Sequence, residues 1–108
     1  MSLTIEDFKK LEIKIGTVVA VDHIEGADKL LKIKFDMGDH ERQILAGIAE
    51  FVQDPQSLVG KQIPILVNLE PRKMRGEISE GMMLAADEEG HPVLLHPERN
   101  VKSGSIVR

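Results

Sequence analysis

The sequence predicts a mainly β protein, on three observations. Apolar residues make up 42% of the 108 residues and there is no Trp or Tyr, so the core consists chiefly of Ile, Val, Leu and Met. The β-branched members of that set favour pleated sheet over helix. Several segments alternate apolar and polar residues, and glycine-containing turns separate them. A chain of this length fits a single domain, residues 1–108.

The first elements are a short helix and a long strand. Thr4, followed by two carboxylates, predicts a helix start that ends near Lys10. Residues 12–23 then alternate with period two, and we expect one face to carry Ile13, Ile15, Thr17, Val19 and Val21. Gly16 is expected to mark a bulge or bend that lets this strand serve two sides of a small barrel.

Two further strands complete a meander. Residues 24–28 predict a loop, and residues 31–37 predict a second strand whose open face is mostly basic. Gly38 and Asp39 predict a hairpin turn into a third strand over residues 42–46.

The second half of the chain predicts a helix and two more strands. Residues 47–53 have helical spacing and Pro55 is expected to end that helix. A fourth strand is expected over residues 62–67, where Pro64 indicates a sheet edge or bulge. Met82, Leu84 and Ala86 indicate the fifth, after which Gly90 turns the chain into a largely apolar tail.

Five short strands with a short helix between strands 3 and 4 match the oligonucleotide-binding (OB) barrel, although several small β folds would also fit. OB barrels commonly bind nucleic acid on the face of strands 2 and 3 and on two loops. The segments outside these strands are terminal extensions, and an oligomer interface is one explanation for them.

Composition limits the function classes. The chain has no cysteine, so disulfides and thiolate chemistry are excluded. No stretch approaches the ~20 apolar residues of a membrane span, and no signal-peptide pattern begins the chain, so we expect a cytoplasmic protein with no membrane contact. The net charge is −4, but residues 61–76 hold four Lys or Arg against one acidic residue. One compact basic segment therefore lies in an acidic protein.

Three of these four cations follow the fourth strand. Arg72, Lys73 and Arg75 fall within four residues, on a loop restricted by Pro71 and freed by Gly76. Together they predict a phosphate-attracting patch. The alternative is that these charges are simply solvated surface.

Five separated blocks carry a resemblance to a known family: residues 7–16, 26–30, 42–48, 67–76 (Val-Asn-Leu-Glu-Pro-Arg-Lys-Met-Arg-Gly) and 79–82 (Ser-Glu-Gly-Met). The chain resembles the tRNA-binding domain found at the C-terminus of bacterial methionyl-tRNA synthetase and as free-standing tRNA-binding proteins. The resemblance implies a homodimer that forms through its terminal segments. It also implies recognition of the folded shape of tRNA, with aminoacylation chemistry located elsewhere.

Carried over by position, the resemblance implies RNA contacts from eight residues: Lys29 in the first loop, Arg42 on the third strand, Asn68, Arg72, Lys73, Arg75, Ser79 and Met82. Asn68 and Ser79 have an equally plausible role in holding the backbone of the loop, and methionine at position 82 is more often core. One departure from many relatives is Glu12-Ile13-Lys14 in place of Asp-Ile-Arg, which loses a bidentate donor.

Other functions find less support. No nucleophile with a base, carboxylate pair or cofactor motif is legible, so we expect no catalytic residue, no cofactor and no metal; His91 and His96 are the only histidines at near ligand spacing. General single-strand binding is disfavoured because aromatic stacking platforms are scarce. A polypeptide-binding dimer resembling the export chaperones of the same fold remains the main rival. Whether the chain is free-standing or part of a synthetase also stays open.

Overall fold

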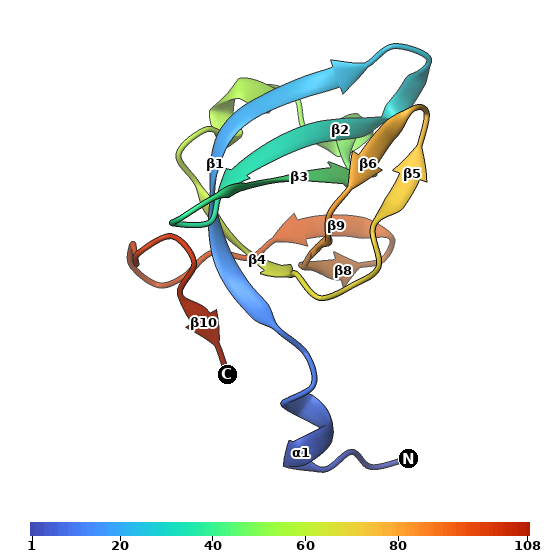
Figure 1. Ribbon diagram of the computed structural model, residues 1–108. Coiled ribbons are helices and arrows are strands. Elements are labelled where there is room, and N and C mark those ends of the chain that lie inside the picture. The colour runs from blue at the N-terminus through green and yellow to red at the C-terminus, as the bar shows by residue number, and fades with distance from the viewer.

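The computed structural model describes residues 1–108 and shows a mainly β architecture, as predicted (Figure 1). The elements, in chain order, are α1 (Ile5–Phe8), β1 (Ile13–Ile24), β2 (Ala27–Asp36), β3 (Glu41–Ala46), the 3-10 helices η1 (Ala49–Phe51) and η2 (Pro55–Leu58), β4 (Gln62–Leu66), β5 (Arg72–Met74), β6 (Glu77–Ser79), β7 (Met82–Met83), β8 (Ala85–Glu88), β9 (His91–Leu94) and β10 (Ile106–Val107).

The long first strand serves two neighbours, as expected. Residues 13–17 of β1 pair antiparallel with β4, and residues 17–24 pair with β2. The main sheet therefore has the order β3-β2-β1-β4-β7, with β10 beside the start of β1. Strong bending of one strand brings both ends of the sheet around a common core.

The five-stranded closed barrel is not confirmed. No ladder joins β3 to β7, so the path of paired strands remains open there. The expected fifth strand is also divided, because β7 pairs with β4 whereas β8 forms a separate hairpin with β9. This hairpin turns at Glu89 and Gly90, both with positive φ, as expected for the turn at Gly90.

The bulge in β1 lies at a different place from the one predicted. Its register with β2 shifts between Val18 and Ala20, so Val18 is buried and Val19 is 41% exposed. Gly16 lies in an unbroken stretch of the β4 ladder and serves close packing instead. A Cβ there would lie 2.8 Å from Ile65 Cδ1 and 2.9 Å from both Met37 Sδ and a Phe35 ring carbon.

The core lies between the two halves of the bent sheet. Its fully buried large side chains are Phe35, Leu31, Ile33, Ile44, Ile63, Ile65 and Val18. All come from β1 to β4. The meander and β4 thus form the rigid body on which the later segments are mounted.

The helix predicted over residues 47–53 is replaced by two short 3-10 helices. Pro55 begins η2 instead of ending a helix, since Asp54 caps that turn by accepting a hydrogen bond from the Gln56 N–H at 3.2 Å. The apolar spacing at Ile48 and Val52 is used to cover the core edge, which needs no complete helical turn.

The N-terminal helix begins as predicted. Thr4 and Asp7 form a reciprocal capping box. The extension is tied back by Asn68, whose side chain accepts from the Glu12 N–H at 2.9 Å and donates to the Lys10 carbonyl at 2.7 Å. None of the helices has the length and apolar content needed to cross a membrane.

Candidate nucleic-acid interface

The basic segment is a β-hairpin and not the loop that we predicted. Lys73 in β5 pairs with Ile78 in β6, and the two-residue turn consists of Arg75 and Gly76. Their φ angles are 52° and 80°. Positive φ at both turn positions is typical of the type I′ hairpin turn, which matches the twist of the flanking strands. Arg75 is thereby held at the hairpin tip.

The three cations of the predicted phosphate-attracting patch lie on this hairpin. Arg72, Lys73 and Arg75 are exposed, and none is within ion-pair distance of a carboxylate. Arg72 makes a 3.9 Å contact with the sulfur of Met74 on the same side of β5. Lys73 lies on the opposite side because strand side chains alternate. The hairpin thus carries unneutralised positive charge along both sides and at its tip.

Contacts with β2 and β3 hold the hairpin in place. The Glu77 carboxylate lies 3.4 Å from Lys32 Nζ and accepts from Gln43 Nε2 at 3.2 Å. Gln43 Nε2 also donates to the Ile78 carbonyl at 3.0 Å. Met74 packs against a small apolar cluster that contains Leu45. The cations are therefore carried on a fixed arm, as Figure 1 shows where β6 lies beside β3.

Ser79 and Glu80 hydrogen-bond to the edge of β3 that faces β7. Glu80 donates its N–H to the Gln43 carbonyl at 2.8 Å, and its carboxylate accepts from the Gln43 N–H at 3.0 Å. The buried Ser79 hydroxyl accepts from the Leu45 N–H at 3.0 Å and donates to the Gly81 carbonyl at 3.1 Å. These bonds satisfy backbone groups of Gln43 and Leu45 at the open edge of the sheet.

Arg42 and Asn68 are engaged in the same region. Arg42 donates through one terminal nitrogen to the carbonyls of Glu80 at 3.0 Å and Val67 at 3.4 Å. The amide of Asn68 is occupied by the N-terminal extension, as described above. Arg42 and Ser79 thus fix the backbone at the base of the hairpin and Asn68 holds the N-terminal extension, whereas Arg72, Lys73 and Arg75 have no carboxylate partner.

The two remaining predicted residues are exposed near the hairpin. Lys29 is the third residue of β2 and does not lie in the loop where we placed it, because the β1–β2 turn is shorter than predicted. The β1–β2 turn itself lies close to the hairpin, because Met74 of β5 packs against the cluster that contains Ile24 and Ala27 on either side of that turn. Met82, 47% exposed, lines a groove beside β5 together with Leu69 and Met74.

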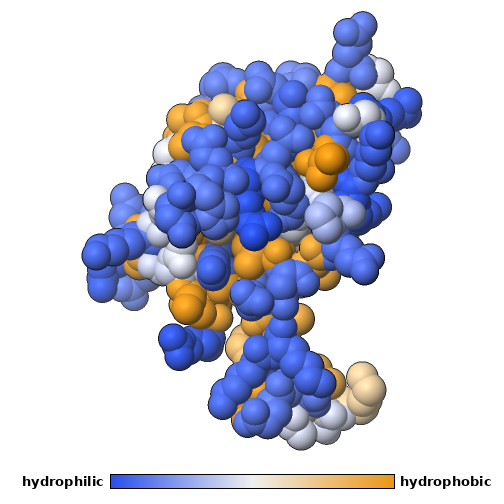
Figure 2. All heavy atoms as spheres, in the orientation of Figure 1, coloured by the Kyte–Doolittle hydropathy of each residue, from blue (hydrophilic) through white to orange (hydrophobic).

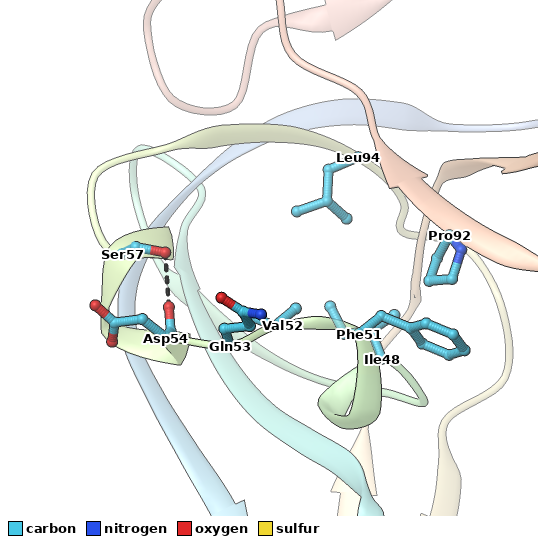
Figure 3. Close-up of a pocket in the computed structure, with 8 residues that line it drawn as sticks. All are labelled: Ile48, Phe51, Val52, Gln53, Asp54, Ser57, Pro92 and Leu94. Atoms are coloured by element: carbon cyan, nitrogen blue, oxygen red, sulfur yellow. Dashed lines mark hydrogen bonds between the residues drawn. The ribbon is translucent and has the colours of Figure 1, made fainter.

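A second hollow of about 420 Å³ lies away from the basic segment, between the 3-10 helices and β9 (Figure 3). Ile48, Val52 and Leu94 form its apolar walls and Asp54 lies on its rim. No Lys or Arg lines this hollow, so it lacks the cationic side chains that the hairpin carries. The hairpin side remains the candidate for nucleic acid.

A family model described as "Putative tRNA binding domain" matches residues 13–106. This chain belongs to that family. The tRNA-binding domain assigned in this way contains every candidate contact residue, and the resemblance inferred from the five sequence blocks is confirmed.

Similar proteins include chains that are much longer than this one. It is 45% identical to a methionine–tRNA ligase of Lactiplantibacillus plantarum and 46% identical to that of Archaeoglobus fulgidus, over 98% and 97% of this chain. In both cases it spans about 16% of the relative's length.

Among solved structures, a MetRS-related protein from Pyrococcus horikoshii matches with a TM-score of 0.92 at 35% identity, and the chaperone CsaA from Bacillus anthracis matches with 0.89 at 29% identity. Each match covers 100% of both chains.

Sequence reasoning missed the residues that position the hairpin. Gln43, Glu77 and Glu80 look like ordinary polar surface in the sequence, and no spacing rule links positions more than thirty residues apart. The basic face of β2 was a signal that an acidic partner packs there, since Lys32 and Lys34 alternate with core residues. Glu77, the partner of Lys32, is identified only in the folded structure, where the hairpin packs beside β2.

Proposed function

We propose that this tRNA-binding domain contacts the phosphates of folded tRNA through the β5–β6 hairpin. The supporting observation is that Arg72, Lys73 and Arg75 share one anchored hairpin and lack carboxylate partners. Cations held in this way release counterions from a polyanion without first breaking an internal ion pair. Lys29 and Met82 flank this surface, while Arg42 and Ser79 hold the backbone at its base.

The test is a salt titration of tRNA binding by fluorescence anisotropy. Each phosphate contact contributes about 0.7 to 0.9 to the slope of log affinity against log salt. Replacing Arg72, Lys73 and Arg75 with alanine should therefore reduce the slope by about two to three. An unchanged slope would contradict the assignment.

A charge-matched control separates this effect from net charge. Lys61, Arg99 and Lys102 are exposed and lie outside the hairpin. Their triple alanine variant has the same net charge as the hairpin variant, −7 from the parent value of −4. It should change the slope by less than about one, because only long-range attraction is altered.

We further propose that the domain dimerises through its terminal segments. Ile5, Leu11 and Ile106 are exposed at 66%, 46% and 58%. They line a largely apolar hollow of about 430 Å³ between α1 and β10. Apolar surface is visible where the N-terminal segment leaves the body (Figure 2). Light scattering should give twice the chain mass, and Leu11→Asp should give the monomer mass.

The relatives support a place for this domain in a cytoplasmic methionine–tRNA ligase, where it would add tRNA affinity while another part of the chain performs aminoacylation. A free-standing tRNA-binding dimer is the alternative, supported by the full-length match to the MetRS-related protein.

The match to CsaA makes polypeptide binding a second candidate. The two functions differ in salt dependence, since an apolar polypeptide contact releases few counterions. Competition of an unfolded, uncharged polypeptide against labelled tRNA distinguishes them. We expect no displacement at concentrations where unlabelled tRNA displaces fully.

A further inference from the structure

A groove of about 440 Å³ runs beside the cationic hairpin. Its apolar lining comes from four side chains, Leu45, Leu69, Met74 and Met82. The Ser79 hydroxyl also faces it but is already satisfied by the Leu45 N–H and the Gly81 carbonyl. Glu70 and Arg72 are therefore the polar side chains of the lining that have capacity for a ligand.

Glu70 places a negative charge on a surface that is otherwise positively charged. It is the only acidic residue between positions 61 and 76. It is exposed and forms no ion pair, not even with Arg72, which lines the same groove. A free carboxylate repels the phosphates that the hairpin attracts. It is compatible with bound RNA only if it contacts a part of the nucleotide that donates hydrogen bonds.

We propose that this groove holds one unpaired base of the bound RNA and that Glu70 makes it prefer guanine. A carboxylate is an acceptor with two oxygens. The Watson–Crick edge of guanine presents two adjacent donors, N1–H and the N2 amino group, whereas adenine, cytosine and uracil place an acceptor next to their donor.

The rest of the groove suits the same occupant. Unpaired RNA bases are commonly read on their Watson–Crick edges while their faces lie against side chains. Here the flat faces would contact Met74, Met82 and Leu69, and polarizable thioethers replace the aromatic platforms that this chain lacks. The adjacent Arg72 would contact the phosphate of the same nucleotide, which matches the opposite charges of Glu70 and Arg72 to the two ends of one nucleotide.

The test uses methyl NMR of the full chain labelled with ¹³C at the methionine methyl groups. The five methionines include Met74 and Met82 in the groove and the buried Met37, which reports on the fold. The probes are the single-stranded trinucleotides UGU and UAU. We expect UGU to shift the two groove methyls and to bind about fivefold or more tightly than UAU, since a good bidentate contact distinguishes bases at this level.

The Glu70→Gln variant should bring UGU and UAU within about twofold of each other, because an amide offers one acceptor and a misplaced donor. Glu88→Gln removes the same charge outside the groove and should retain the preference. Equal affinity of the parent protein for the two trinucleotides, or unmoved Met74 and Met82 methyls, would overturn the proposal.

This inference rests on the proposed RNA function, and the two can fail separately. If tRNA binds with the expected salt slope while the groove methyls stay unmoved, phosphate binding stands and the base site falls. If neither tRNA nor trinucleotide binds, both proposals fall.

Discussion

The clearest structural prediction concerns Ser79, because its hydroxyl replaces a backbone partner at the open edge of the sheet. The side chain is 4% exposed and satisfies the Leu45 N–H and the Gly81 carbonyl. In Ser79→Ala both groups lose that partner. Leaving a buried donor unsatisfied costs about 1 to 3 kcal/mol, whereas the half-buried Gly81 carbonyl can accept from water at a smaller cost.

We therefore expect Ser79→Ala to lower the free energy of unfolding by about 2 kcal/mol, in the range that an orphaned buried donor costs. For a domain of this size that corresponds to a fall in Tm of roughly 10 °C. Urea unfolding at fixed protein concentration measures the change, and the slope with denaturant should stay constant because the surface exposed on unfolding is the same.

Ser57 provides the control, since its exposed hydroxyl donates only to the Asp54 carbonyl at 2.6 Å. Ser57→Ala should change stability by less than about 0.5 kcal/mol, as is usual at exposed positions. Undiminished stability of Ser79→Ala together with a tenfold loss of tRNA affinity would refute the structural reasoning. Ser79 would then be an RNA contact, as the family resemblance implies.

Four further predictions concern single positions. Gly16→Ala should lower the free energy of unfolding by about 1 to 3 kcal/mol, measured in urea, because its Cβ overpacks the core. Arg75→Gly should leave stability equal or raise it by up to about 1 kcal/mol, since the left-handed turn position disfavours a side chain, yet reduce the tRNA salt slope by about one contact. Asn68→Ala should speed amide exchange in the N-terminal extension, followed by NMR, because it removes both hydrogen bonds that tie that segment down. Hydrogen bonding from the backbone and side chain of Thr4 lowers the pKa of Asp7. The ionised carboxylate therefore stabilises the helix start at any pH above its unfolded pKa. The NMR chemical shift that the Thr4 N–H owes to its hydrogen bond with Asp7 should vanish as the pH falls through the lowered pKa.

Local chemistry in the sequence was sufficient for much of this fold. The period-two alternation along residues 31–37 and 42–46, and the turn residues Gly38 and Asp39 between them, predicted β2 and β3, although β2 begins earlier than predicted, at Ala27. The capping residue Thr4 predicted the start of α1. These features depend on neighbours a few residues apart, so a linear sequence contains what decides them.

Three predictions were wrong at places where packing against distant segments of the chain decides the local structure. Alternation placed Val19 inside and Val18 outside, but the bulge in β1 reverses them, since one strand must serve two neighbours. Helical spacing at residues 47–53 gave way to two 3-10 helices over the edge of the core. The loop expected at residues 72–76 folds into a hairpin because β2 and β3 offer it a surface.

For the site, the sequence alone determined that positive charge is concentrated on one short segment of an acidic chain. Only the tertiary structure decided which polar residues are free to bind. Glu77 pairs with Lys32 across forty-five positions, and Ser79 is satisfied by a backbone group thirty-four positions away. A hydrogen bond depends on distance in space, and the folded sheet sets that distance. The same residue types therefore serve either as exposed groups that can bind a ligand or as internal hydrogen-bond partners.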